Sequence, residues 1–168
     1  MRKIYLASNS KARRELLKKM GVRFVVMPSK AKEIKKASGS SYVKLVKANA
    51  LAKAKEVAGR LRSGLIIAAD TIMVQDKRIF GKPKDLSDAK KMLKRLSRAK
   101  QSVYTGVAVI DKDSGKKIVD YEKTHVFMHK LSDNEIDAYF KEVSRLDKAG
   151  SFDIQGKGGL FIRKIDGC

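Results

Sequence analysis

The stretch Leu65-Ile66-Ile67-Ala68-Ala69-Asp70-Thr71 decides the fold of this chain. Its apolar part is typical of a strand that lies buried at the centre of a sheet. Asp70 follows directly, at the mouth of that strand, where an acidic side chain is costly unless a partner or a ligand uses it. Ligands of open α/β sheets collect at the carboxyl ends of strands. The stretch therefore predicts a central strand over Leu65–Ala69 that ends in a functional carboxylate. The alternative is a carboxylate that only caps the next turn.

Strand and helix patterns alternate before this stretch, whereas strand patterns pair after it. The expected strands are Ile4–Ala7, Phe24–Met27, Leu65–Ala69, Thr71–Val74, Arg78–Phe80, Ser102–Ile110, Ile118–Met128 and Leu160–Ile165. The expected helices are Lys11–Met20, Ser41–Ala58, Ser87–Leu96 and one that a capping box of Ser132 and Glu135 begins and that reaches Lys141. Loops are expected at Lys30–Ser40 and Asp147–Gly159. This order predicts the mixed α/β class.

Length and composition limit the class of protein. The 168 residues fit one domain, or one domain with two lobes. With 43% hydrophobic and 34% charged residues, the chain is expected to be soluble and globular rather than disordered. No apolar run approaches the length of a membrane span, and no signal peptide is visible at the start, so a cytoplasmic location is expected. The single cysteine, Cys168, excludes an internal disulfide and a zinc site built from cysteines.

The formal net charge of +21 raises the alternative of a nucleic-acid-binding module. The basic residues are spread over the whole length, and only five Tyr and six Phe are present for base stacking. This distribution favours a solvated, lysine-rich surface that would draw an anionic substrate toward a cleft. We therefore expect no stable nucleic-acid partner, and the nucleic-acid-binding module stays open as the alternative.

Ser8, Ser10 and Arg13 lie at the expected turn between the first strand and the first helix. Amide groups at a helix start, with hydroxyls and an arginine one turn in, suit a phosphate. The motif is not a P-loop, because the glycines and the Gly-Lys-Ser/Thr ending are missing. The alternative is an ordinary helix cap beside a surface arginine.

Asp70 is accompanied by cations from distant parts of the chain, notably Arg13, Lys53 and Lys82. One carboxylate with several cations suits a site that binds a polyphosphate through a divalent metal and activates water. Lys82 lies in the stiff sequence Gly81-Lys82-Pro83, which is suited to placing a cation on a phosphate. Lys53 lies near the apolar side of its helix, where a lysine more often extends its amine back to solvent.

Two further polar residues have weaker patterns. Glu33 lies in a polar segment and, on pattern alone, is expected to be exposed to solvent. Gln155 lies among glycines that would let the backbone approach a base, which the amide of Gln155 could read. The same glycines could equally serve turns. His125 and His129 alternate with apolar residues, so neither a metal nor a pH role is expected for them.

Taken together, these segments resemble the Maf family of nucleotide pyrophosphatases over essentially the whole chain. The matching pieces are Leu6–Ser10 with Arg13, Pro28-Ser29 followed by Glu33, Tyr42-Val43, Lys53-Ala54, Ala69–Thr71, Gly81–Asp85, Arg95–Ser97, Thr105–Val107 and Asp147–Gly156. Each piece is short, but their order and spacing together are specific. The resemblance implies a mixed sheet with flanking helices, in two lobes around a central cleft, and a single family domain over residues 1–168.

The resemblance also implies an activity: hydrolysis of a nucleoside triphosphate to the monophosphate and pyrophosphate with Mg²⁺ or Mn²⁺. Asp70 would activate water and, with Glu33, help to hold the metal. The phosphates would be held by Ser8, Arg13, Lys53 and Lys82, with Ser10 in the same turn. The segment around Gln155 resembles the branch that acts on dTTP and UTP, in which Thr71 and Gln155 help to set base choice. A homodimer is expected by the same analogy.

The chain departs from the family pattern at several positions. Lys11-Ala12 stands where the family usually has Pro-Arg, so an arginine tied to base selection is missing. Ala68 replaces a usual glycine, and Gln101 replaces a frequent histidine. The sequence reaches Cys168 where relatives continue, so we expect it to lack the family's C-terminal segment. These departures leave a catalytically inactive relative with an interaction role as a further alternative.

Overall fold

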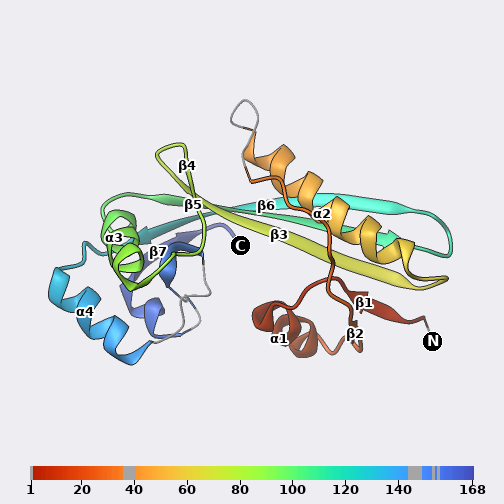
Figure 1. Cartoon of the computed structure of the whole chain (residues 1–168), viewed down its shortest axis with the longest axis horizontal. Coiled ribbons are helices and arrows are strands. Elements are labelled where there is room, and N and C mark those ends of the chain that lie inside the picture. Colours follow the sequence, from red (N-terminus) through yellow and green to blue (C-terminus); the bar gives the residue numbers. More distant parts are fainter. Residues whose placement is uncertain (1, 36–40, 144–148, 153, 155) are drawn as a thin grey trace. The chain divides into compact units, whose positions relative to one another are not determined.

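A computed structural model describes residues 2–35, 41–143, 149–152, 154 and 156–168. Within these ranges, seven strands form one mixed sheet with four α-helices (Figure 1). The strands are β1 (Ile4–Leu6), β2 (Val25–Val26), β3 (Leu65–Gln75), β4 (Arg78–Phe80), β5 (Gln101–Asp111), β6 (Lys117–Met128) and β7 (Ile162–Asp166). The helices are α1 (Lys11–Lys19), α2 (Tyr42–Gly59), α3 (Leu86–Leu96) and α4 (Asp133–Glu142), with 3₁₀ helices η2 (Ala149–Ser151) and η3 (Lys157–Phe161). The mixed α/β class is confirmed.

The sheet has the strand order β2-β1-β3-β5-β6-β7, and β4 pairs with β3 outside this path. β1 is parallel to both β2 and β3, whereas β4 and β7 pair in the antiparallel sense. In the part of the chain that is described, no helix is both long and apolar enough to cross a membrane.

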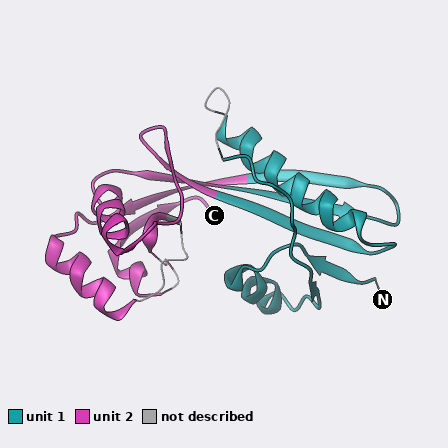
Figure 2. Cartoon of the chain, viewed as in Figure 1, with its two compact units in different colours: residues 1–71, 105–121 teal, residues 72–104, 122–168 magenta. Residues whose placement is uncertain are grey.

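The chain divides into two compact units (Figure 2). Unit 1 contains Met1–Thr71 and Thr105–Tyr121, and unit 2 contains Ile72–Tyr104 and Glu122–Cys168. Each unit has a core of its own. Alanines of α2 pack with β3 and β5 in unit 1 (Ala50, Ala54, Ala58, Ile66, Ala68, Ala108). Larger side chains of α3, α4 and the strands fill unit 2 (Met73, Leu93, Leu96, Val126, Ile136, Phe140).

Helix α2 lies very close to β5 in unit 1. A Cβ added at Gly106 would lie 2.4 Å from the backbone carbon and oxygen of Val46. Only a glycine permits this approach, and the small side chains of Ala50 and Ala54 let the same helix lie close to the sheet. The close packing brings the polar residues of this helix face onto β3.

The observed bounds of β3 differ from those that the sequence predicts. The sequence predicts a strand that ends at Ala69, with Asp70 at its mouth, but the structure has one continuous strand over Leu65–Gln75. Asp70 instead lies beside the end of a neighbouring strand, because the β1 register stops at Leu6 opposite Ile67. The carboxyl end of β1 therefore replaces the end of β3 as the place where a ligand could reach Asp70.

The last strand also begins later than expected. The apolar run from Leu160 predicts a strand, but Lys157–Phe161 forms the 3₁₀ helix η3, and β7 starts at Ile162. The reason lies in the glycines of η3, because a Cβ at Gly159 would lie 2.7 Å from the carbonyl oxygen of Ile154. A hydrogen bond from the Gly159 N–H to the Gly156 carbonyl at 3.0 Å closes the turn there.

Candidate active site

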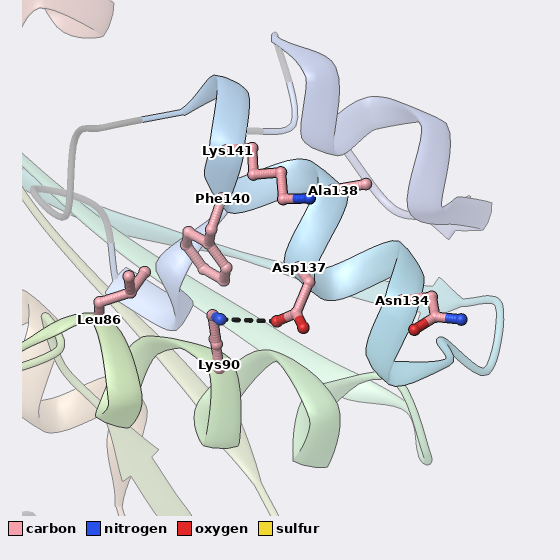
Figure 3. Close-up of a pocket in the computed structure, with 7 residues that line it drawn as sticks. All are labelled: Leu86, Lys90, Asn134, Asp137, Ala138, Phe140 and Lys141. Carbon is pink, nitrogen blue, oxygen red and sulfur yellow. Dashed lines mark ion pairs between the residues drawn. The ribbon is translucent and has the colours of Figure 1, made fainter.

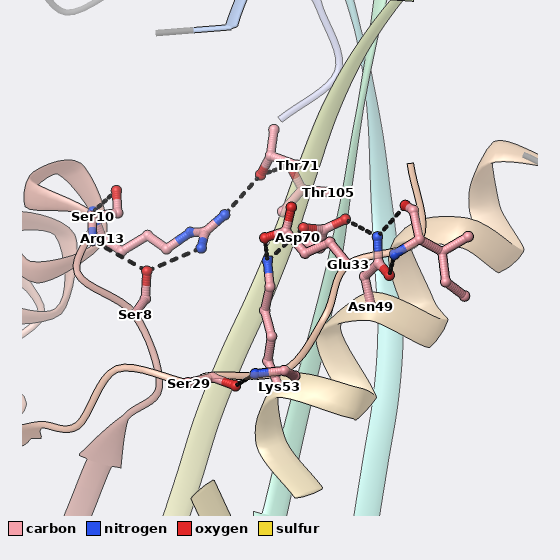
Figure 4. A network of polar contacts seen from close by, with 12 residues as sticks. Ser8, Ser10, Arg13, Ser29, Glu33, Asn49, Lys53, Asp70, Thr71 and Thr105 are labelled. Atoms are coloured by element: carbon pink, nitrogen blue, oxygen red, sulfur yellow. Dashed lines mark hydrogen bonds and ion pairs between the residues drawn. The ribbon is translucent and has the colours of Figure 1, made fainter. Parts of the chain in front are cut away.

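Asp70 is the centre of a polar network in unit 1 (Figure 4). Its carboxylate is buried and has two donors from α2: Lys53 Nζ lies 2.6 Å from Oδ1, and Asn49 Nδ2 donates to Oδ2 at 2.9 Å. Asn49 and Lys53 are four residues apart, so they share one face of the helix. Two donors from one rigid helix fix both oxygens of the carboxylate and offset the cost of its burial.

Lys53 bridges two carboxylates. Its Nζ lies 2.6 Å from Asp70 Oδ1 and 2.7 Å from Glu33 Oε1. The interpretation in which Lys53 extends its amine to solvent is wrong, because the amine pairs with Asp70 and Glu33 and the Lys53 side chain is only 12% exposed. Glu33 is half-exposed, as its pattern predicts, but it is also ion-paired.

Asn49 of α2 also belongs to the network, although its sequence pattern did not single it out. Its buried amide accepts the N–H of Ile34 at 2.9 Å and donates to the Ile34 carbonyl at 3.0 Å, while Nδ2 also donates to Asp70. The segment that carries Glu33 is thereby tied to α2, the helix whose Asn49 also bonds the Asp70 carboxylate. The available signal was a polar residue of modest helix propensity within an apolar helical face.

Arg13 approaches the network from α1. Its Nη1 donates to Ser8 Oγ at 3.1 Å, and its Nη2 donates to Thr71 Oγ1 at 3.3 Å. Burial lowers the pKa of the Arg13 guanidinium, while the charges of Asp70 and Glu33 act in the opposite direction. Within the described residues, both of these hydrogen bonds end on neutral hydroxyls. A partly buried guanidinium held this way is arranged to receive an anion.

The turn before α1 contains the helix cap that its sequence suggested. Ser10 is the N-cap of α1, and its Oγ accepts the N–H of Arg13 at 3.4 Å. Ser8 Oγ accepts the N–H of Ser10 at 3.2 Å and also the guanidinium of Arg13. The ordinary cap is therefore present at Ser10, while Ser8 faces the network.

A pair of hydroxyls lies at the other end of the network. Thr71 Oγ1 and Thr105 Oγ1 are 3.1 Å apart, and Thr105 comes from β5. In the sequence, Thr105 belongs only to the matching motif Thr105–Val107, because no local pattern connects it to residue 71.

The structure brings together six of the expected site residues, all in unit 1: Ser8, Arg13, Glu33, Lys53, Asp70 and Thr71. Lys82 belongs to unit 2, between β4 and α3, and its role stays a prediction. Gln155 lies outside the described residues.

The donor atoms suit a hard divalent cation. Among the described residues, no group of three or more His, Cys, Asp or Glu side chains could hold a metal by itself. Asp70 and Glu33 supply two carboxylates. Protein sites bind Mg²⁺ through one or two carboxylates when substrate phosphates and water complete its shell. These residues fit a metal that arrives with a phosphate ligand.

A cavity in unit 2 provides a contrast (Figure 3). Its volume is about 360 Å³, and it lies between α3 and α4, lined by Leu86, Lys90, Asn134, Asp137, Ala138, Phe140 and Lys141. The single carboxylate of this lining, Asp137, is paired with Lys90 at 2.6 Å. Because its lining has one carboxylate and no second acidic ligand, this cavity lacks the chemistry of the Asp70 network.

A solved structure with a similar arrangement of helices and strands indicates the fold class. The Staphylococcus aureus Ham1 protein has a TM-score of 0.53 to this chain at 15% identity, over 76% of this chain and 72% of that chain. The two proteins therefore share an α/β fold.

Sequence comparison gives the family. The model of the Maf-like protein family matches residues 3–168. A relative from Bacillus anthracis (strain CDC 684 / NRRL 3495) named dTTP/UTP pyrophosphatase is 46% identical over 167 residues, which cover 99% of this chain and 86% of the relative. A protein of the same name from Carboxydothermus hydrogenoformans is 41% identical over 166 residues, with 99% and 88% covered. The chain belongs to the Maf-like family, which confirms the resemblance.

Proposed function

We propose that this chain hydrolyses nucleoside triphosphates to the monophosphate and pyrophosphate, and that dTTP and UTP are its preferred substrates. The observation that carries the proposal is the buried Asp70 carboxylate, oriented by Lys53 and Asn49, beside Arg13, which donates to the hydroxyls of Ser8 and Thr71. The family and the names of the relatives, dTTP/UTP pyrophosphatase, support this choice of reaction.

In the proposed reaction, water attacks the α-phosphorus and the bond from that phosphorus to the bridging oxygen of pyrophosphate breaks. Asp70 accepts the proton of the attacking water as its oxygen bonds to phosphorus. Lys53 and Asn49 hold the carboxylate in one orientation, so that little reorganisation is needed during the step.

The remaining groups bind and neutralise the substrate. Arg13 and Ser8 bind a phosphate, and the positive charge of Arg13 offsets charge on the leaving pyrophosphate. Lys82 would add a second cation, and Gln155 would contact the base. A divalent cation held by Asp70, Glu33 and the phosphates would supply Lewis-acid polarisation of the phosphoryl group. The proposal includes the cytoplasmic location and the homodimer expected above.

Release of pyrophosphate from dTTP, UTP and CTP in the presence of Mg²⁺ or Mn²⁺ tests the proposal. The variant Asp70→Asn keeps the size of the side chain but cannot accept the proton, so kcat should fall by about 10²–10⁴-fold while nucleotide binding remains. Asp137→Asn is the matched control, because it removes a paired carboxylate from unit 2 and should leave kcat unchanged.

Equal turnover by wild type and Asp70→Asn would contradict the role of Asp70. Absence of turnover in the wild type, together with oligonucleotide binding that weakens steeply with salt, would favour the nucleic-acid-binding module suggested by the net charge of +21.

A further inference from the structure

Thr105 belongs to the polar network but has no part in the reaction described above. Its Oγ1 lies 3.1 Å from Thr71 Oγ1, which in turn accepts a hydrogen bond from Arg13 Nη2 at 3.3 Å (Figure 4). The next residue along β5, Gly106, is pressed against the backbone of Val46 in α2. The position of Thr105 is therefore fixed by close backbone packing, which is what a recognition group requires.

The direction of these hydrogen bonds follows from the donor at one end. A guanidinium can only donate, so Thr71 Oγ1 must act as the acceptor toward Arg13. The hydroxyl proton of Thr71 is then available for Thr105, and the proton of Thr105 is left for a further acceptor. Successive hydrogen bonds in one direction polarise one another, which favours this outward order over its reverse.

The chemistry of Thr105 points to a neutral acceptor. The charged groups of this network come from α1, α2, β3 and the segment that carries Glu33, whereas Thr105 lies on β5 and is separated from Arg13 by Thr71. A neutral hydroxyl at this end is suited to the uncharged part of a nucleotide rather than to its phosphates. The substrates proposed above, dTTP and UTP, differ in the sugar and at C5 of the base but share the keto oxygen at C4.

We propose that Thr105 is a specificity-determining residue whose hydroxyl donates to the C4 keto oxygen of the bound pyrimidine. This inference rests on the proposed function and adds a residue to it. In cytosine an amine replaces the C4 keto oxygen. An amine is a donor, so it would face the outward-pointing proton of Thr105 without a hydrogen bond.

The test compares Thr105→Val, which keeps the shape but removes the hydroxyl, with Thr105→Ser, which keeps the hydroxyl. For Thr105→Val, kcat/KM for UTP should fall about tenfold, mainly through KM, while the value for CTP changes little. Thr105→Ser should restore the ratio of UTP to CTP. Thr124→Val is the control, because the hydroxyl of Thr124 donates to the Cys168 carbonyl in unit 2.

Inhibition by pyrophosphate separates the base from the phosphates. It should be the same for wild type and Thr105→Val if Thr105 contacts the base. Weaker pyrophosphate inhibition, or an equal loss with UTP and CTP, would overturn the inference in favour of a phosphate contact or a structural role. An unchanged ratio of UTP to CTP would also overturn it.

Failure of the proposed function is a separate result. A wild-type protein that releases no pyrophosphate would overturn the proposed hydrolysis, and calorimetric binding of UTP and CTP to wild type and Thr105→Val would then decide the role of Thr105. A tenfold loss confined to UTP binding would support the inference, and equal binding by both proteins would refute it.

Discussion

Two lysine–aspartate ion pairs, one in each unit, have the same distance between nitrogen and oxygen but differ in how deeply their side chains are buried. Lys53 and Asp70 in unit 1 are 2.6 Å apart, as are Lys90 and Asp137 in unit 2. The side chains of the first pair are 12% and 7% exposed, whereas those of the second are 38% and 50% exposed. The distance between the charged atoms therefore says little about what a pair does, and burial says more.

The two pairs also differ in the groups around them. Lys53 has a second carboxylate, Glu33, and Asp70 has a second donor, Asn49. A buried pair contributes little net stability, because desolvation offsets most of its attraction. Such a pair with further polar partners is typical of a functional site, whereas an exposed pair such as Lys90 and Asp137 is typical of a solvated surface.

The largest effect is expected from a substitution that breaks the close contact between α2 and β5. Gly106→Ala would place a Cβ at 2.4 Å from the backbone of Val46, which cannot move aside as a flexible side chain can. We expect a loss of more than about 3 kcal/mol in the free energy of unfolding, measured in urea. Gly59→Ala in α2 is the control, because nothing lies within 4 Å of its added Cβ. It should be neutral or stabilise the helix by up to about 1 kcal/mol. Similar losses for both variants would contradict the close packing.

The second prediction tests the comparison directly. Lys53→Met leaves the Asp70 carboxylate buried without its cation, so the free energy of unfolding should fall by about 3 kcal/mol at neutral pH. Lys90→Met removes the exposed partner of Asp137 and should change it by less than about 1 kcal/mol. Urea unfolding of both variants measures the difference.

A double variant sharpens this result. Adding Asp70→Asn to Lys53→Met removes the uncompensated charge, so part of the lost stability should return. Equal losses for Lys53→Met and Lys90→Met, or no recovery in the double variant, would show that the burial of the first pair has no energetic consequence.

Local patterns predicted the elements well because their signals lie within a few residues. Helix α2 follows from its apolar spacing, and the capping box of Ser132 and Glu135 is present at the start of α4. The prediction that the central strand ends at Ala69 is wrong for a physical reason. An acidic residue has a poor strand propensity, but pairing in the middle of the sheet keeps the strand continuous through Asp70.

The site was only partly predictable, since its contacts join residues far apart in sequence. Asn49 is 21 residues from Asp70, and Thr105 is 34 residues from Thr71. Their meeting depends on the register of α2 and β5 against β3, which no short pattern contains. Asp70 could be selected because an acidic residue after an apolar run is costly in itself, whereas an asparagine or a threonine carries no such signal.

The smallest expected effect concerns an exposed carboxylate in unit 2, which sharpens the contrast with the buried Asp70. Hydrogen bonds from the Ser132 hydroxyl and then the Ser132 backbone lower the pKa of Glu135 below its ordinary value of 4.5. A carboxylate whose pKa is lowered by folding adds stability above that ordinary value and loses it as the pH falls through the lowered value. Glu135→Gln should therefore be slightly less stable than wild type at neutral pH.

The difference in the free energy of unfolding between wild type and Glu135→Gln should narrow as the pH drops below 4.5, where the wild-type carboxyl becomes protonated. We call this difference the gap. Urea unfolding of both proteins across that range measures it. The effect should be smaller than that of Lys53→Met, because Glu135 is exposed to solvent. With Ser132→Ala in the background, the largest cause of the lowered pKa is gone, so the pH dependence of the gap should weaken. A gap that stays constant with pH in the otherwise wild-type protein, or a pH dependence that Ser132→Ala leaves unchanged, would mean that the Ser132 cap does not stabilise the ionised form of Glu135.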